Sequence, residues 1–330
     1  MRLAAATMGL VVAGLLLEGA LRVVQRKGST TARRAIGIHE RHRASIDRPH
    51  FRRPRPRRRS AEPFHILVVG DSFTWGDGIY HADTYAQRIE SLLERMDHGL
   101  DVRVSMYSRP GWNTQQEYQM VRLHLRRLDP DLIVLGYCLN DAELRQRRGN
   151  DDIMEPLTRR RPTSGLERLL SNGSRLYSWV WERVENGRQR RAFNHYYHEL
   201  YSRPGWQEAQ AALDGFRQLS WEHNIPLAVL LFPIFDQQLD SSYSYRDLHR
   251  LVMNALRELD IPAVDLLPAY RGVDAVRLAV EPFTDPHPNE LAHRIASQYL
   301  VDFLVREELV PITPTQRDRV ELSLPRRKRG

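Results

Sequence analysis

The sequence predicts an α/β protein, a three-layer α/β/α sandwich around a mostly parallel five-stranded sheet, preceded by an N-terminal transmembrane helix. The chain has 330 residues, 42% of them hydrophobic, which is enough for a large domain with a buried core. From Phe64 onward, short apolar runs alternate with amphipathic patterns. That alternation is typical of a parallel sheet with helices on both faces.

The first element is an apolar segment over residues 3–21, in which only Thr7 and Glu18 are clearly polar. As a helix it would be about 28 Å long, just enough to cross a hydrocarbon core. A cleaved signal peptide is the alternative, but no clear small-x-small cleavage site precedes the polar residues. We therefore predict a membrane anchor over residues 1–26.

Residues 27–63 are predicted to form a basic, Pro/Arg-rich linker, and residues 311–330 a basic tail. The overall net charge is +8, yet residues 22–60 carry +12 and residues 317–330 carry +4, which leaves −8 for residues 61–316. The linker is either a solvated tether or a contact for anionic lipid headgroups. The acidic body argues against a nucleic-acid partner.

Five short apolar runs are candidate strands: 65–69, 102–107, 132–137, 227–232 and 263–266. Amphipathic patterns between and after them predict helices at 85–96, 115–128, 207–222, 245–259 and 291–307. Together they define a domain over residues 64–310. A charged, aromatic-rich insertion at 144–205 interrupts the rhythm, and insertions of that length form helical excursions or lids.

Candidate functional residues follow the predicted strands, where ligands bind in a parallel α/β sheet. Ser72 follows the first strand, Gly111 the second and Asn140 the third. Asp285 and His287 precede the last helix and would face the same side of an extended segment. Ester hydrolysis needs a nucleophile, a base, a group that orients the base and donors for the oxyanion. Each residue alone is an ordinary turn or cap former, but the chain offers one candidate for every role.

The same residues carry a resemblance to the SGNH (GDSL-like) hydrolases over residues 64–305. The matching segments are Gly70-Asp71-Ser72-Phe73-Thr74, Gly111-Trp112-Asn113-Thr114, Asn140-Asp141 and Asp285-Pro286-His287-Pro288-Asn289. The resemblance implies a flavodoxin-like fold, Ser72 as nucleophile, His287 as base and Asp285 as its orienting group. It also implies an oxyanion hole made of the Ser72 and Gly111 backbone N–H groups and the Asn140 side chain. The anchor ending at residues 16–22 is similar to bacterial membrane-anchored members.

Two positions depart from the family's usual pattern. Only Pro286 separates Asp285 from His287, whereas the common spacing is Asp-x-x-His. Ala292-His293 stands where Gly-His is typical, which makes His293 the rival base. The single cysteine, Cys138, excludes an intrachain disulfide and a cysteine-based zinc site. No cofactor or metal is expected.

These observations predict a membrane-anchored serine esterase with an acyl-Ser72 intermediate, acting on an O-acetylated cell-envelope polysaccharide by deacetylation or acetyl transfer. A lipase or thioesterase acting on lipid esters and a non-catalytic carbohydrate-binding module remain as alternatives. A periplasmic body suits an envelope substrate. The bases after the anchor, set against Arg2 alone before it, favour a cytoplasmic body, so orientation stays open.

Overall fold

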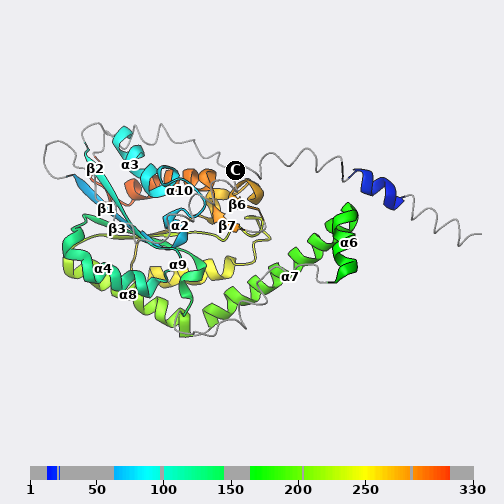
Figure 1. The fold of residues 1–330 in the computed structure, drawn as a ribbon. Helices are drawn as coiled ribbons and strands as arrows, with labels where there is room; N and C mark the ends of the chain where they lie inside the picture. The colour runs from blue at the N-terminus through cyan, green and yellow to red at the C-terminus, as the bar shows by residue number, and fades with distance from the viewer. Residues whose placement is uncertain are drawn as a thin grey trace, which may run out of the picture. The chain divides into compact units, whose positions relative to one another are not determined.

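The computed structural model describes residues 13–20, 22, 63–96, 100–144, 164–202, 204–282 and 285–312 (Figure 1). The chain divides into two compact units. The α/β unit comprises the described residues of 38–146 and 197–330, and the helical unit comprises those of 1–37 and 147–196.

The α/β unit is built on a five-stranded sheet in the order β2-β1-β3-β4-β5, in which every pair is parallel. The strands are β1 (Phe64–Gly70), β2 (Val102–Ser108), β3 (Leu132–Tyr137), β4 (Leu227–Leu231) and β5 (Ala263–Asp265). Each coincides with a predicted strand to within one or two residues. This order is that of flavodoxin-like folds, so the predicted α/β fold with its parallel sheet is confirmed.

Helices cover both faces of this sheet (Figure 1). They are α3 (Tyr85–Met96), α4 (Thr114–Leu128), α8 (Pro204–His223), α9 (Arg246–Glu258) and α10 (Glu290–Arg306). α3 packs with α10, and α4 packs with α8 on the opposite face. The chain moves outward from β1 to β2 and then back across the sheet, so right-handed crossovers place α3 on one face and α4, α8 and α9 on the other.

The centre of the sheet is dry because its strands are buried on both faces. All six residues of β3 and all five of β4 are buried, as are six of the seven in β1. Near-continuous apolar runs such as Leu132–Tyr137 follow from this burial, since a strand covered on both faces has no solvent side. A rigid sheet therefore supports the loops at its carboxyl edge.

Several short elements at that edge have no counterpart in the sequence prediction. α2 (Ser72–Trp75) follows β1, and an antiparallel pair of strands, β6 (Ala279–Glu281) and β7 (Asp285–Pro288), precedes α10. The 3₁₀ turns are η1 (His81–Asp83), η2 (Leu139–Ala142), η4 (Leu267–Tyr270) and η5 (Ala275–Arg277). α2, η2 and β7 hold all the candidate functional residues except Gly111, which lies between β2 and α4.

The helical unit contains a short helix over residues 13–20, α6 (Gly165–Gly173) and most of α7 (Arg175–Ser202), whose last residues belong to the α/β unit. The predicted insertion is thus helical where it is described, while its role as a lid stays a prediction. Within the described ranges, no helix has both the length and the apolar character needed to cross a bilayer. Residues 1–12 of the predicted anchor, most of the linker and the tail from 313 lie outside the described residues.

Candidate active site

Ser72 occupies the first position of α2, and only Asp71 separates it from the end of strand β1. Asp71 caps this helix, because its carboxylate accepts a 2.8 Å hydrogen bond from the Phe73 backbone N–H. Gly70 is required here, since a Cβ on it would clash with Thr74 Oγ1 and lie 2.9 Å from the Gly136 carbonyl oxygen. The tight turn leaves Ser72 only 6% exposed.

The structure joins Ser72, His287 and Asp285 in one hydrogen-bonded chain. The Ser72 hydroxyl lies 2.9 Å from His287 Nε2, and His287 Nδ1 lies 2.5 Å from Asp285 Oδ1. Since Nδ1–H donates to the carboxylate, Nε2 is left to accept the Ser72 proton. The Ser72 hydroxyl is also 3.4 Å from Asp71 Oδ2, too long to compete with the histidine.

The unusual Asp-Pro-His spacing works because these residues form a strand. Asp285 and His287 are alternate residues of β7, so their side chains lie on the same face. β7 pairs with β6, with Glu281 opposite Asp285 and Ala279 opposite Pro288. Asn289 then caps α10 and donates from its side chain to the Ala279 carbonyl at 3.0 Å, which closes the base of the pair.

The charge state of His287 is set by opposing effects. Burial lowers its pKa, but the hydrogen bond and charge of Asp285, with smaller contributions from Asp77 and Asp71, raise the pKa above its usual value. The Phe73 ring packs against the imidazole at a centroid distance of 5.3 Å. The geometry can therefore take a proton from Ser72 and hold it as an imidazolium beside a carboxylate.

His293, the rival base, makes different contacts. Its Nδ1 accepts a 3.0 Å hydrogen bond from the Tyr85 backbone N–H at the start of α3, and its ring stacks on the Tyr85 ring. Burial lowers its pKa to about 3, with the charges of Arg88 and His287 adding to the effect. His293 is a neutral histidine that joins α10 to α3, while Ser72 is bonded to His287.

Asn140 lies beside Ser72 and is held by Asp71. Its side-chain amide donates to Asp71 Oδ2 at 2.9 Å, although the two residues are 69 positions apart. Because an amide has two N–H donors, one remains after this bond. Asp71 thus links the loop after β1 to the loop after β3, in addition to capping α2.

Gly111 lies in the turn after β2 and has a φ of +74°, a conformation that favours glycine. Asn113, two residues after Gly111, caps α4 and donates to the Glu143 carbonyl oxygen at 2.7 Å. That bond ties the loop after β2 to the loop after β3. Whether the Gly111 N–H faces the oxyanion stays a prediction.

The sequence prediction missed a buried acidic layer behind the site. Asp71, Glu117 and Asp141 are each at least 98% buried, and Asp141 caps η2 through the Cys138 backbone N–H at 2.7 Å. Burial raises the pKa of Asp71 and, more strongly, the pKa values of Glu117 and Asp141. The charge of Asp71 raises the pKa of Glu117 further, and the charges of Glu117 and Asp71 raise the pKa of Asp141 further. Spacing alone gives no signal of this cluster, because Glu117 comes from the middle of a helical pattern.

In the described part of the chain, no group of three or more His, Cys, Asp or Glu side chains is placed to hold a metal ion.

A doubly wound α/β unit with a Ser-His-Asp chain at the carboxyl edge of its sheet defines a serine-hydrolase type of site. The model of the GDSL-like lipase/acylhydrolase family matches residues 68–295, and the chain belongs to this family. It is an enzyme, a hydrolase that acts on ester bonds. The matched segment begins in β1 and ends in α10, so it includes every candidate residue.

Solved structures with a similar fold include TesA, with 15% identity, a TM-score of 0.43 and coverage of 73% of this chain and 97% of that one. A catalytic mutant of Axe2, an acetylxylan esterase from Geobacillus stearothermophilus, is 15% identical with a TM-score of 0.46. The match covers 74% of this chain and 93% of that one. LAE5, an alpha/beta hydrolase enzyme from the metagenome of Lake Arreo, is 14% identical with a TM-score of 0.46. The match covers 74% of this chain and 96% of that one. These similarities carry no argument about substrate. No curated protein matches the chain.

Proposed function

We propose that the protein is a serine esterase that forms an acyl-Ser72 intermediate, with His287 as general base and Asp285 as the group that orients it. The observation that carries the proposal is the continuous Ser72–His287–Asp285 hydrogen-bonded chain. His287 would take the Ser72 proton as the hydroxyl attacks the ester carbonyl, and would return it to the leaving alcohol. The acyl group would then pass to water or to another hydroxyl.

The oxyanion formed by that attack needs preorganised donors. We assign this role to the Ser72 backbone N–H, the Gly111 backbone N–H and the Asn140 amide. The second N–H of Asn140 supports its inclusion, because the bond to Asp71 fixes the amide beside Ser72. The positive φ of Gly111 is compatible with a backbone N–H turned into the site.

The preferred acyl group is proposed to be short. Phe73, Phe232 and Phe235 are buried and pack ring to ring, with the first of them against His287. Buried aromatic rings on that side of the imidazole support a small acyl site. This supports acetyl removal or transfer, on a cell-envelope polysaccharide, over cleavage of long-chain lipid esters.

The N-terminal segment is proposed to anchor the chain in a membrane, with the body on the periplasmic side. The apolar character of residues 3–21 supports the anchor, and an O-acetylated envelope polysaccharide would be within reach of such a body. Reporter fusions after residue 310 test the orientation. Activity of a fused reporter that functions only in the cytoplasm would contradict a periplasmic body.

The decisive experiment on the chemistry compares wild type with Ser72→Ala on p-nitrophenyl acetate. We expect the variant to lose at least about 10³ in kcat. A fluorophosphonate probe should label wild type and not Ser72→Ala, which separates an active serine from an inert one. Equal turnover by both proteins would eliminate Ser72 as the nucleophile.

A chain-length series tests the acyl preference separately. The value of kcat/KM should fall from p-nitrophenyl acetate to butyrate to octanoate. A maximum at octanoate would contradict the short-acyl proposal and would favour the lipid-ester alternative, without affecting the assignment of Ser72.

A further inference from the structure

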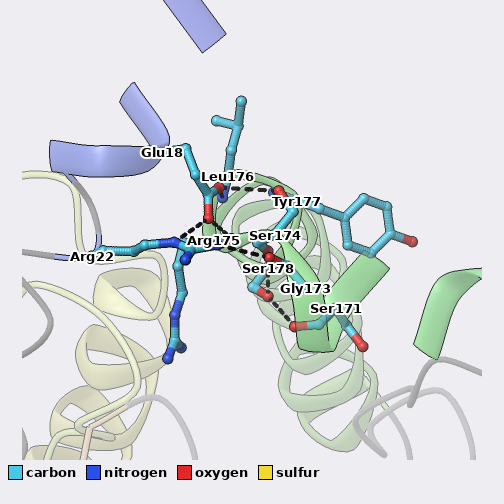
Figure 2. Close-up of polar contacts among 9 residues, drawn as sticks. All are labelled: Glu18, Arg22, Ser171, Gly173, Ser174, Arg175, Leu176, Tyr177 and Ser178. Atoms are coloured by element: carbon cyan, nitrogen blue, oxygen red, sulfur yellow. Dashed lines mark hydrogen bonds and ion pairs between the residues drawn. The ribbon is translucent and has the colours of Figure 1, made fainter. Parts of the chain in front are cut away.

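The helical unit has a latch centred on Glu18, a charged residue in an otherwise apolar N-terminal segment (Figure 2). Its carboxylate accepts 2.7 Å hydrogen bonds from the backbone N–H groups of Arg175 and Leu176, the first two residues of α7. The Ser174 hydroxyl donates to the same carboxylate at 3.1 Å. Glu18 is only 16% exposed, so these bonds enclose it.

The latch satisfies groups that a helix end otherwise leaves without a partner. The first N–H groups of a helix have no intrahelical acceptor. Ser174 caps the N–H of Tyr177, and Glu18 takes the two N–H groups before it. Arg22 pairs with Glu18 at 2.8 Å and also donates to the Gly173 carbonyl at 3.0 Å, at the end of α6. The N-terminal helix is thus fixed to both α6 and α7.

The three helices joined by this latch expose an unusual amount of apolar surface. Of the fourteen large apolar side chains exposed among the described residues, nine lie in the helical unit, although that unit holds 42 of the 234 residues described. The nine are Leu15, Leu16 and Leu17 of the N-terminal helix, Leu166, Leu169 and Leu170 of α6, and Trp179, Val180 and Val184 of α7. A concentration of this kind marks an interaction surface.

The charge of the unit indicates the partner. Its described residues include seven arginines against four glutamates, whereas residues 61–316 as a whole carry −8. The Arg183 guanidinium lies over the Trp179 ring at 4.9 Å, and both side chains are exposed. Leucine and tryptophan interleaved with arginine on a helix is the composition of segments that lie in the interface of an anionic bilayer.

We propose that the helical unit lies on the surface of an anionic phospholipid bilayer and that Glu18 holds the N-terminal helix against α6 and α7 to form this lipid-binding surface. The lipid contact would extend beyond the predicted anchor to α6 and the first half of α7. Arginines of the unit would meet the lipid phosphates while the leucines and Trp179 enter the headgroup region. The proposal goes beyond the esterase function, and its readouts do not depend on catalysis.

The test attaches an environment-sensitive fluorophore to the full chain through Leu169→Cys or Val184→Cys, which are 69% and 68% exposed. The native Cys138 is fully buried and is replaced by alanine. Leu123→Cys on α4 is the matched control, because Leu123 is equally exposed, at 69%, but belongs to the α/β unit. Each protein is reconstituted into vesicles of equal parts phosphatidylcholine and phosphatidylglycerol.

We expect a blue shift and quenching by spin-labelled lipid at positions 169 and 184, and neither at 123. Both responses should weaken in phosphatidylcholine alone, since the arginines then lose their anionic partner. Responses at 169 and 184 that match the control would overturn the lipid proposal. A blue shift without vesicles that grows with protein concentration would also overturn it, in favour of a second copy of the chain.

The latch has its own readout in hydrogen exchange of the Arg175 and Leu176 amides. Glu18→Ala should speed their exchange by about tenfold or more, because a charge-assisted hydrogen bond to each is lost. Glu182→Ala removes an exposed carboxylate from the same unit and should leave both rates unchanged. Unchanged exchange in Glu18→Ala would overturn the latch.

Discussion

Asp285 determines the proton affinity of the proposed base, so its removal should be visible in the pH dependence of catalysis. Burial favours neutral His287, while the Asp285 hydrogen bond and charge raise its pKa to a net value above the usual range. A general base works when neutral, so kcat/KM should rise with pH through a pKa above about 6.5.

In Asp285→Asn, we expect kcat to fall by about 10³–10⁴ and the acid limb of kcat/KM to move to lower pH. The loss reflects the wrong tautomer, and the shift reflects burial acting without a compensating charge. A pH–rate profile on p-nitrophenyl acetate measures both effects. An acid limb at the same pH as in wild type would show that Asp285 does not control the base.

Asn140 has one observed contact, with Asp71, and one proposed role, as an oxyanion donor, and mutation can separate them. As an oxyanion donor, it should contribute about 10²–10³ to kcat, so Asn140→Ala should lower kcat by that factor with little change in KM. As a partner of Asp71, it also holds the cap of α2. Asp71→Ala removes the cap and the bond that holds the Asn140 amide, but it keeps the amide group itself.

The two variants are compared in kcat and in the free energy of unfolding. A donor role predicts that Asn140→Ala loses turnover while remaining more stable than Asp71→Ala. If both variants lose the same stability and the same turnover, Asn140 acts only by positioning Asp71.

At the level of elements, His293 connects α10 to the first residue of α3 through the Tyr85 N–H. Its pKa is about 3 in the folded protein, against 6.5 for an ordinary histidine. Between these two pH values the unfolded state binds more protons than the folded state, so the free energy of unfolding rises with pH. The contribution of neutral His293 to that free energy reaches its full value above pH 6.5. Each pH unit below 6.5 therefore costs about 1.4 kcal/mol until pH 3 is approached.

We expect wild type to lose roughly 2 kcal/mol more stability than His293→Asn between pH 6.5 and pH 5. Asparagine retains an acceptor for the Tyr85 N–H and does not titrate. Urea denaturation at the two pH values gives the difference, in which other titrating groups cancel. Parallel pH dependence in both proteins would mean that His293 is not buried as a neutral group.

The sequence predicts regular elements better than the pieces between them. β3 reads as a continuous apolar run and α3 as an amphipathic pattern, and both were placed at their observed bounds. The β6–β7 pair was not predicted, because β6 has only three residues and β7 only four, two of which are proline, and neither shows an apolar alternation. Their pairing depends on Asn289 and on contacts with the rest of the fold.

The same limit applies to the candidate site. Order along the chain suggested Ser72, Asn140 and His287, since strand ends of a parallel sheet meet at one edge. The bond between Asp71 and Asn140 spans 69 positions, and no local pattern reports it. Glu117 is buried because α4 packs against the sheet. In the amphipathic sequence pattern of this helix, nothing distinguishes Glu117 from a glutamate that faces solvent.

For the whole molecule, the division into two units predicts that ester hydrolysis is independent of the N-terminal region. β1 begins at Phe64, and every proposed catalytic group lies between Ser72 and His287. Glu18 and its partners Ser174, Arg175 and Leu176 belong to the helical unit. Deletion of residues 1–62 should therefore change vesicle binding without changing the chemistry.

The shortened chain, residues 63–330, should hydrolyse p-nitrophenyl acetate with kcat/KM within about threefold of the full chain in detergent, because every proposed catalytic group belongs to the α/β unit. Ser72→Ala in the same shortened chain sets the background. Circular dichroism and urea denaturation establish that the α/β unit is folded before rates are compared. A folded but inactive shortened chain would show that the N-terminal region contributes to the active site, and would contradict the prediction that catalysis needs only the α/β unit.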